Sequence, residues 1–322
     1  MRISRDRLMT ESETTGFRPE ILEKAIHLLS LLEILNSHPQ LKGKLALKGG
    51  TALNLFMFKV PRLSVDIDMN YVGSTDRTSM EEDRPLLERA ITAICGREGY
   101  TIIRSPSEHA GGKFRLQYQS AVTPTGILEI DLNFMLRVPL WPVSLQDSFP
   151  VGSYSASGIP LLDLHEIAAG KFAALLSRRV ARDLYDSHRL FQCGLLDADK
   201  LRLAFVVYGA INRKDWRIVK SDDIESNLRD LENQLVPVLR NDALSHVVDR
   251  GMWAQSLVDE CRSSLSAMLP LRINESKFID LILDHGKVQP DLLTPDHEMQ
   301  ERISAHPGVQ WKALNVRKHK AK

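Results

Sequence analysis

The feature that most constrains this chain is a pair of glycines, Gly49 and Gly50, followed by Thr51 and an apolar segment at residues 52–56. Glycine lacks a Cβ atom, so two in a row let the backbone turn tightly and direct its N–H groups toward an anion. The apolar segment is typical of a short helix, and a helix N-terminus attracts phosphate through its unpaired N–H groups and its dipole. The pattern predicts a phosphate-binding turn or, alternatively, a purely structural one.

An alternating segment at residues 65–71 follows this turn and indicates a half-buried strand. Asp66 and Asp68 fall on its polar face, with Cα atoms roughly 7 Å apart, given a rise of about 3.4 Å per residue. Two carboxylates at this separation could converge on hard cations, and without a cation they would repel each other. The alternative is a solvated strand face that carries two acids.

A second acidic strand is predicted at residues 127–134, where Glu129 and Asp131 share the polar face. If the two strands are neighbours, Asp131 or Glu129 could join Asp66 and Asp68, and the sequence leaves open which of them does. A glycine turn before a helix, an Asp-x-Asp strand and a later acidic strand resemble DNA polymerase β-type nucleotidyltransferases. In that pattern the glycines hold a triphosphate and the acids hold Mg²⁺.

Four blocks of sequence make the resemblance more specific. Residues 47–53 (LKGGTAL) and 62–68 (RLSVDID) are followed by residues 164–175 (LHEIAAGKFAAL) and 182–186 (RDLYD). Together they resemble the AbiEii family of bacterial nucleotidyltransferase toxins, which includes the mycobacterial MenT toxins. The likeness spans residues 20–190.

The resemblance implies an α/β fold with a polymerase β-like nucleotidyltransferase core at residues 17–158. A mostly helical C-terminal domain at residues 159–322 would complete the active-site cleft. The implied reaction is transfer of a nucleoside monophosphate (NMP) from a nucleoside triphosphate (NTP) to RNA, at the 3′ end of tRNA. The implied biological role is that of a growth-arresting toxin, in a toxin–antitoxin or abortive-infection system, held in check by an antitoxin protein.

The resemblance also assigns site residues. The expected catalytic residues are Asp66, Asp68, Lys171 and Asp186. The expected nucleotide-binding residues are Lys48, Gly49, Gly50, Thr51, Ser64 and Arg182. The expected Mg²⁺ ligands are Asp66, Asp68 and Asp131.

The residues themselves leave structural alternatives for the downstream blocks. Lys171 lies among alanine, glycine and phenylalanine, so its side chain could extend to water rather than bind phosphate. Asp183 could cap a helix with Asp186 in its first turn. Asp163, with Glu166 three residues later, predicts a capping box at the start of another helix.

Other segments are assigned by their patterns. Apolar spacing predicts helices at residues 19–35, 84–98 and 243–250, and alternation predicts a β-hairpin at residues 113–134. The polar face of that hairpin carries Lys113 and Arg115, which could be solvated or could contact nucleotide or RNA.

Composition limits the function classes. With 322 residues the chain can bury a sizeable core, and a formal net charge of +1 excludes a uniformly basic nucleic-acid-coating protein. Three widely separated cysteines fit neither a disulfide framework nor a zinc site, which favours a cytoplasmic protein. No segment is apolar enough to span a membrane. The remaining alternatives are a small-molecule nucleotidyltransferase, such as those that modify antibiotics, and a non-catalytic NTP-binding module.

Overall fold

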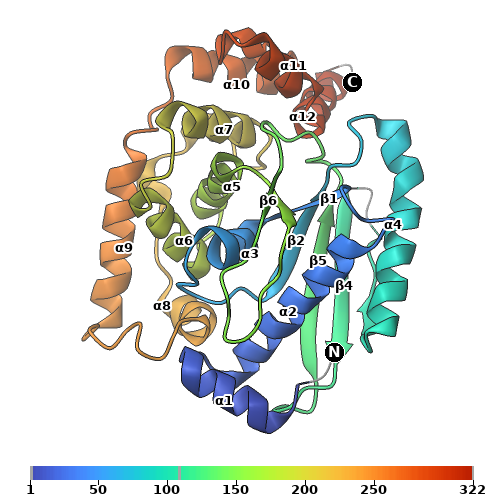
Figure 1. Cartoon of the computed structure of the whole chain (residues 1–322). Helices are drawn as coiled ribbons and strands as arrows, with labels where there is room; N and C mark the ends of the chain where they lie inside the picture. The colour runs from blue at the N-terminus through green and yellow to red at the C-terminus, as the bar shows by residue number, and fades with distance from the viewer. Residues whose placement is uncertain (1–2, 108–109, 321–322) are drawn as a thin grey trace. The chain divides into compact units, whose positions relative to one another are not determined.

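The computed structural model describes residues 3–107 and 110–320, and the chain divides into two units. Unit 1 comprises residues 1–137, 143–162 and 237–246. Unit 2 comprises residues 138–142, 163–236 and 247–322. The fold is mixed α/β, as predicted (Figure 1).

Unit 1 is built on a seven-stranded sheet with the order β3-β4-β5-β2-β1-β7-β6. Strand β2 pairs with β5 in parallel, β1 pairs with β7 in parallel, and the other neighbours are antiparallel. The strands are β1 (Leu45–Lys48), β2 (Asp66–Tyr71), β3 (Thr101–Arg104), β4 (Gly111–Tyr118), β5 (Gly126–Asn133), β6 (Ser144–Gln146) and β7 (Ile159–Leu161).

Helices cover the apolar face of this sheet. Helix α2 (Pro19–Ser37) packs on β2 and β5, and α4 (Arg77–Arg97) packs on β3, while α1 (Arg5–Thr15) packs on α2 (Figure 1). Ile67, Met69 and Ile130 alternate with the acids of β2 and β5 and are buried. Each fully buried side chain of this size contributes about 1.5–3 kcal/mol relative to an exposed one, so burial fixes which face of the sheet is polar.

The predicted hairpin and the acidic strands are confirmed, but one helix boundary is wrong. Helix α4 begins at Arg77 rather than Arg84, because Asp76 accepts a hydrogen bond from the N–H of Ser79 and caps the helix there. The helix then continues through Pro85.

A late segment of the chain returns to unit 1. The N–H of Leu63 donates to the carbonyl oxygen of Val238 (2.8 Å), and the N–H of Asn241 donates to that of Gly16 (2.8 Å). The first of these hydrogen bonds fixes the backbone at Leu63, just before β2. Residues 241–246 form turns and residues 247–249 are not helical, so the helix predicted at 243–250 is wrong.

Unit 2 is helical. Its longer helices are α5 (Leu164–Ser177), α6 (Ala181–Gln192), α7 (Ala198–Ala210), α9 (Arg250–Leu265), α10 (Ile273–His285), α11 (His297–Ala305) and α12 (Pro307–Lys320). Short helical turns are η2 (Trp216–Ile218), η3 (Ser221–Asp223), α8 (Leu228–Asp230), η4 (Leu231–Leu235) and η6 (Pro290–Leu292), while η5 (Val236–Val238) crosses the boundary into unit 1.

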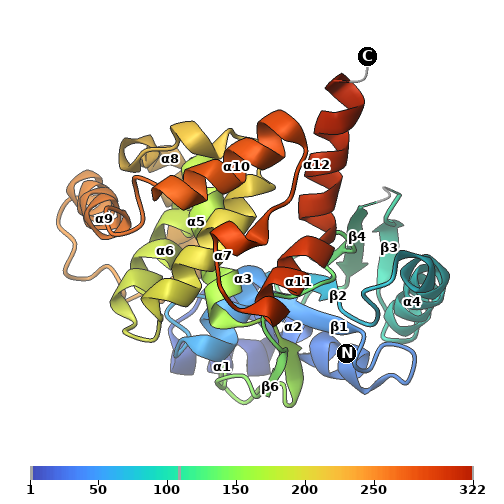
Figure 2. The ribbon, with the colours of Figure 1, turned by 90° about the horizontal axis from the view of Figure 1, so that it is seen from above.

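Helix α7 is central to unit 2 because it packs against α5, α10 and α12. Figure 2 shows α12 beside α10 and α11, and the structure gives contacts between α12 and both of these helices. No helix among the described residues is both long enough and apolar enough to cross a membrane.

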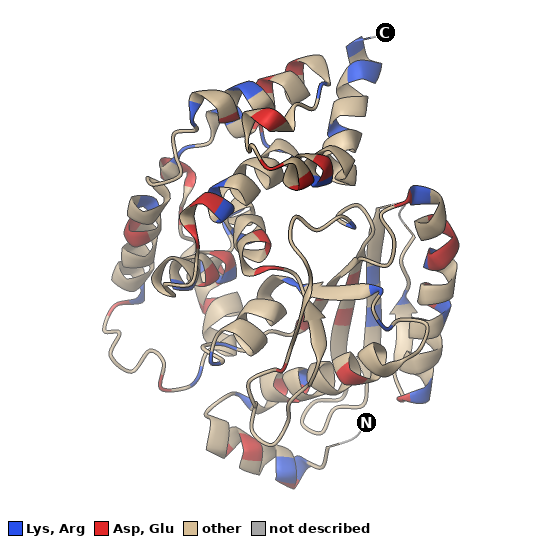
Figure 3. Ribbon diagram, turned by 45° about the horizontal axis from the view of Figure 1, so that its top comes forward, with Lys and Arg blue, Asp and Glu red and all other residues tan. Residues whose placement is uncertain are grey.

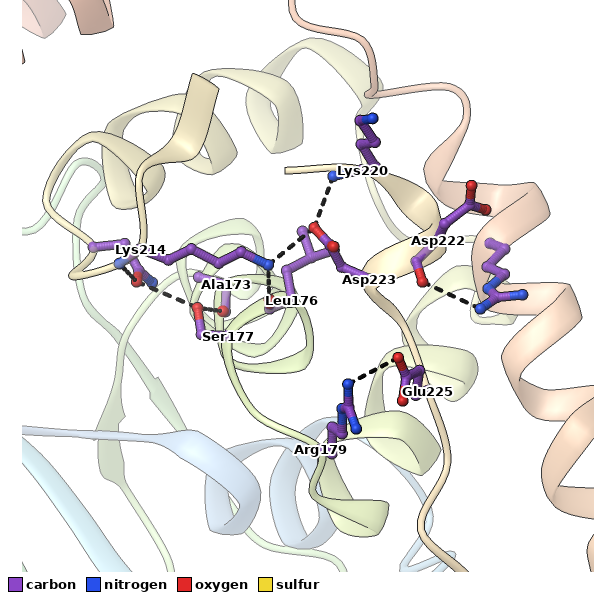
Figure 4. Close-up of polar contacts among 11 residues, drawn as sticks. Ala173, Leu176, Ser177, Arg179, Lys214, Lys220, Asp222, Asp223 and Glu225 are labelled. Atoms are coloured by element: carbon purple, nitrogen blue, oxygen red, sulfur yellow. Dashed lines mark hydrogen bonds and ion pairs between the residues drawn. The ribbon is translucent and has the colours of Figure 1, made fainter. Parts of the chain in front are cut away.

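Polar contacts join the segment that follows α7 to the end of α5 and to the connection after α5 (Figure 4). Lys214 donates from Nζ to the carbonyl oxygen of Leu176 (3.0 Å) and to Asp223 (2.9 Å). A cation at this point complements the partial negative charge of the C-terminal end of α5. Arg179, in the connection after α5, pairs with Glu225 (2.9 Å). This ion pair joins the connection to the segment that also contains Asp223.

Only one of the two contacts of the capping box predicted at the start of α5 is present. Asp163 is the N-cap and accepts from the N–H of His165 (2.8 Å). Glu166 instead points into the core of unit 2, where it accepts from the Tyr208 hydroxyl (3.0 Å) and from the N–H of Trp141 (3.2 Å). Burial is the main cause that raises the pKa of Glu166 to about 7.

Candidate functional site

The glycine turn of unit 1 packs directly against an acid of the neighbouring strand. Gly49 has a φ of +73°, in the left-handed region that favours glycine, and a Cβ atom there would lie 2.4 Å from Oδ2 of Asp68. The chain then forms the helical turn α3 (Gly49–Thr51) and the wider turn η1 (Ala52–Met57). Gly49 is therefore required both by backbone conformation and by the closeness of Asp68.

Thr51 fastens this turn to the start of β2. Its hydroxyl donates to the carbonyl oxygen of Asp66 (2.5 Å) and lies 2.9 Å from the Oγ of Ser64. Thr51 and Ser64 are both buried. The carbonyl oxygen of Gly50 accepts from Nδ2 of Asn54 (2.9 Å), which holds the turn from its other side. These contacts give Thr51 and Ser64 a positioning role in addition to the predicted role in nucleotide binding.

The sheet register brings the predicted acids together. Asp68 lies opposite Asp131 and Asp66 lies opposite Glu129 in the parallel pair β2–β5. On the other side of β2, Lys48 lies opposite Asp68. Opposed residues share a face of the sheet with Cβ atoms about 5 Å apart. Lys48, Asp66, Asp68, Glu129 and Asp131 thus form one polar surface.

Charges on this surface separate the roles of the two acids of β5. Glu129 is engaged by two cations: Lys113 Nζ lies 3.0 Å from its Oε2, and Arg115 Nε lies 3.8 Å from its Oε1. Burial, and then the charge of Asp68, raise the pKa of Asp131, while Lys48 and Lys113 oppose this rise. Asp131 is therefore the better candidate for a third carboxylate beside Asp68.

Within residues 3–107 and 110–320, no three histidine, cysteine, aspartate or glutamate side chains are gathered in a way that could hold a metal ion. Mg²⁺ is usually held by one or two carboxylates together with substrate phosphates and water. Asp68 and Asp131 offer hard oxygen ligands, and their mutual repulsion would be relieved by a cation.

Unit 2 contains the other predicted residues. Lys171 of α5 lies 2.7 Å from Asp186 and 3.1 Å from Asp183, both on α6 and both buried. Arg178 also contacts Asp183 (2.7 Å). The Lys171 side chain is only 11% exposed, so the alternative in which it extends to water is wrong. Arg182 is half-buried in the first turn of α6.

Asp183 does not cap α6 as the sequence suggested. Val180 is the N-cap residue, with no side-chain cap, and Asp183 and Asp186 instead share the helix face that meets Lys171. Asp183 and Asp186 are three residues apart, and side chains at this spacing are neighbours on a helix. The spacing could therefore have indicated that both carboxylates meet the same cation. Sequence reasoning missed Asp183 as a member of the cluster.

Comparison with known proteins agrees with these observations. A family model described as the nucleotidyl transferase AbiEii toxin of type IV toxin–antitoxin systems matches residues 30–258. Among solved structures, the chain is similar to MenT4, a nucleotidyltransferase toxin from Mycobacterium tuberculosis H37Rv, with a TM-score of 0.56. The two share 14% sequence identity over 96% of this chain and 99% of that chain, so this likeness shows the fold. No curated protein sequence matches the chain. The family model covers well over half of the sequence, and the chain therefore belongs to the AbiEii nucleotidyltransferase toxin family.

Proposed function

We propose that this protein transfers an NMP from an NTP to a hydroxyl of RNA, at the 3′ end of tRNA, and arrests growth by doing so. The family supplies the reaction class and implies an NTP substrate and an antitoxin partner. The observation that carries the proposal is the contact of the Gly49 turn with Asp68, which itself lies opposite Asp131. This arrangement puts an anion-binding turn beside a carboxylate pair.

Each group of unit 1 has a defined task in this reaction. Backbone N–H groups of Gly49, Gly50 and Thr51 bind the phosphates, and Lys48 adds positive charge beside Asp68. Ser64 and Thr51 keep the turn against β2. The acceptor oxygen forms a bond to the α-phosphorus, the bond to the β-phosphate oxygen breaks, and pyrophosphate leaves with that electron pair. The hydroxyl proton passes to a carboxylate of the site.

Mg²⁺ would be held by Asp68 and Asp131, with Asp66 as the third carboxylate, and would neutralise the phosphates of the bound nucleotide. The three acids are opposed or alternate on one sheet face, and Asp131 has a raised pKa beside Asp68.

Roles for Lys171, Asp186 and Arg182 in activity are proposed from the family motifs. Lys171 would supply positive charge to the phosphates, and Arg182 would bind nucleotide. Asp186 holds the Lys171 ammonium at 2.7 Å and would position it. We place the reaction in the cytoplasm, where tRNA and NTPs are both present.

The test is incubation of the protein with total RNA, Mg²⁺ and each α-labelled NTP in turn. Label in the tRNA band with one or more NTPs supports the proposal. A parallel series offers small hydroxyl compounds as acceptors. Labelling of these compounds alone would favour a small-molecule nucleotidyltransferase, and NTP binding without labelling of any acceptor would favour a non-catalytic module.

A further inference from the structure

A row of side chains runs from the carboxylates of unit 1 across the β4–β3 end of the same sheet. Asp66 lies opposite Glu129, Glu129 lies opposite Arg115, and Arg115 lies opposite Arg104. Opposed residues of neighbouring strands share a face. The row is therefore acidic on β2 and β5 and basic on β4 and β3.

A bulge in β3 places Arg104 in this row. Ile102 lies opposite Leu116, and the next registered pair is Arg104 with Arg115, so Ile103 is an extra residue. Strict alternation would put Arg104 on the same face as Ile102, which is the face of buried Leu116. The extra residue shifts the alternation by one and turns Arg104 to the polar face.

A second cation lies beside this row. Lys113 of β4 is opposite Asp131, which is opposite Asp68. The side chains of Lys113 and Arg115 are 46% and 52% exposed, although both contact Glu129, and Arg104 is exposed as well. Exposed ion pairs of this kind contribute at most about 1 kcal/mol, so an incoming phosphate can replace Glu129 as their partner. Figure 3 shows basic and acidic segments side by side on the sheet.

The length of the row indicates the class of ligand. Arg104 lies three strands from Asp66, a distance of about 14 Å at roughly 4.8 Å per strand. A small acceptor bound at the carboxylates would not extend this far, whereas a nucleic-acid backbone would, with one phosphate per nucleotide. The net charge of the whole chain is only +1, so this basic surface is a local feature.

We propose that Arg104, Lys113 and Arg115, here called the basic strip, bind the phosphodiester backbone of the acceptor RNA and lead its terminal hydroxyl to Asp66 and Asp68. The inference rests on the proposed function and names a surface for its acceptor. Phosphate contacts of this kind fix the position of the RNA without reading its bases.

The test measures RNA binding without catalysis. Fluorescently labelled total tRNA is titrated with the full-length protein in the absence of NTP and Mg²⁺, at several salt concentrations between about 50 and 200 mM. The strip variant is Arg104→Gln/Arg115→Gln. The control variant, Arg89→Gln/Arg97→Gln, removes the same charge from two exposed residues of α4, which packs on β3. Melting temperatures confirm that both variants are folded.

The strip variant is expected to bind tRNA on the order of tenfold more weakly, and the salt dependence of log K should fall by about 1.4–1.8 for two lost phosphate contacts. The control should bind like the wild type. Equal weakening in both variants, unchanged binding in the strip variant, or no tRNA binding by the wild type would each overturn the inference. Failure of the proposed function is distinguishable, because it would appear as absent NMP transfer while the strip still bound tRNA.

Discussion

Gly49 is the residue that joins the proposed phosphate-binding turn to Asp68, and Gly43 provides a matched control. The φ angles of the two glycines are +73° and +74°, but an added Cβ would meet Asp68 only at position 49 and would meet nothing within 4 Å at position 43. Both alanine variants should lose about 1–2 kcal/mol from backbone strain. Only Gly49→Ala should also displace Asp68, so NTP affinity and NMP transfer should fall in this variant and remain in Gly43→Ala. Equal NTP affinity in the two variants would contradict the assigned role of the turn.

Glu166 gives the stability of unit 2 a predicted pH dependence. Its pKa is about 7 in the folded protein against an ordinary 4.5, because the carboxyl group is buried. Between these values the folded chain binds a proton that the unfolded chain has lost, so this contribution to stability is complete below pH 4.5 and is lost as the pH rises through 7.

Replacing Glu166 with Gln removes this titration while keeping the shape of the side chain. Thermal unfolding of the variant and the wild type should differ little near pH 5, and the variant should be the more stable of the two near pH 8. A difference that stays constant between these pH values would show that Glu166 is not the titrating group.

At the scale of helices, the pairing of α5 with α6 makes Lys171 both a structural residue and a proposed active residue. Lys171→Ala removes the cation that two buried carboxylates share, Asp183 and Asp186, and should cost about 3–5 kcal/mol of stability. The cost is this large because the removal of Lys171 leaves both buried carboxylates without this cation.

The double variant Lys171→Met/Asp186→Asn separates the two roles. It removes one buried charge of each sign, so the melting temperature should recover relative to Lys171→Ala. If Lys171 and Asp186 take part in the reaction, the recovered protein should still fail to inhibit growth. Return of toxicity together with stability would limit both residues to a structural role.

The elements show how far sequence reasoning reaches. Alternation located β2 and β5 and the shared face of their acids, because burial of one face imposes a period of two. Alternation could not predict the bulge at Ile103, which turns Arg104 to the other face of the sheet. Ile103 is exposed, and nothing in the sequence marks it as an extra residue. The segment at residues 243–249 has helical spacing but forms turns up to residue 246 and is not helical after it. Spacing alone could not predict this, because it carries no information about what the segment packs against.

At the scale of the whole molecule, the sequence could not predict how the chain is shared between the two units. Contacts between Leu63 and Val238, and between Gly16 and Asn241, join distant segments of the chain within unit 1. Such contacts depend on tertiary packing and leave no periodicity in the sequence. The shared face of the candidate acids was predictable because each lies in a strongly alternating strand, whereas the parallel pairing of Asp68 with Asp131 had to be assumed.

The most direct test of the account is NMP transfer by the Asp68→Asn variant. Asparagine keeps the shape of the side chain and removes the charge, and Asp222→Asn makes the same change at an exposed aspartate of unit 2. Both proteins are incubated with RNA, saturating Mg²⁺ and the α-labelled NTP that the wild type uses. We predict that Asp68→Asn loses at least about a hundredfold in transfer rate, the effect of several kcal/mol of lost charge stabilisation, while remaining folded. Asp222→Asn should transfer at the wild-type rate, and wild-type turnover by Asp68→Asn would contradict the assignment of the site.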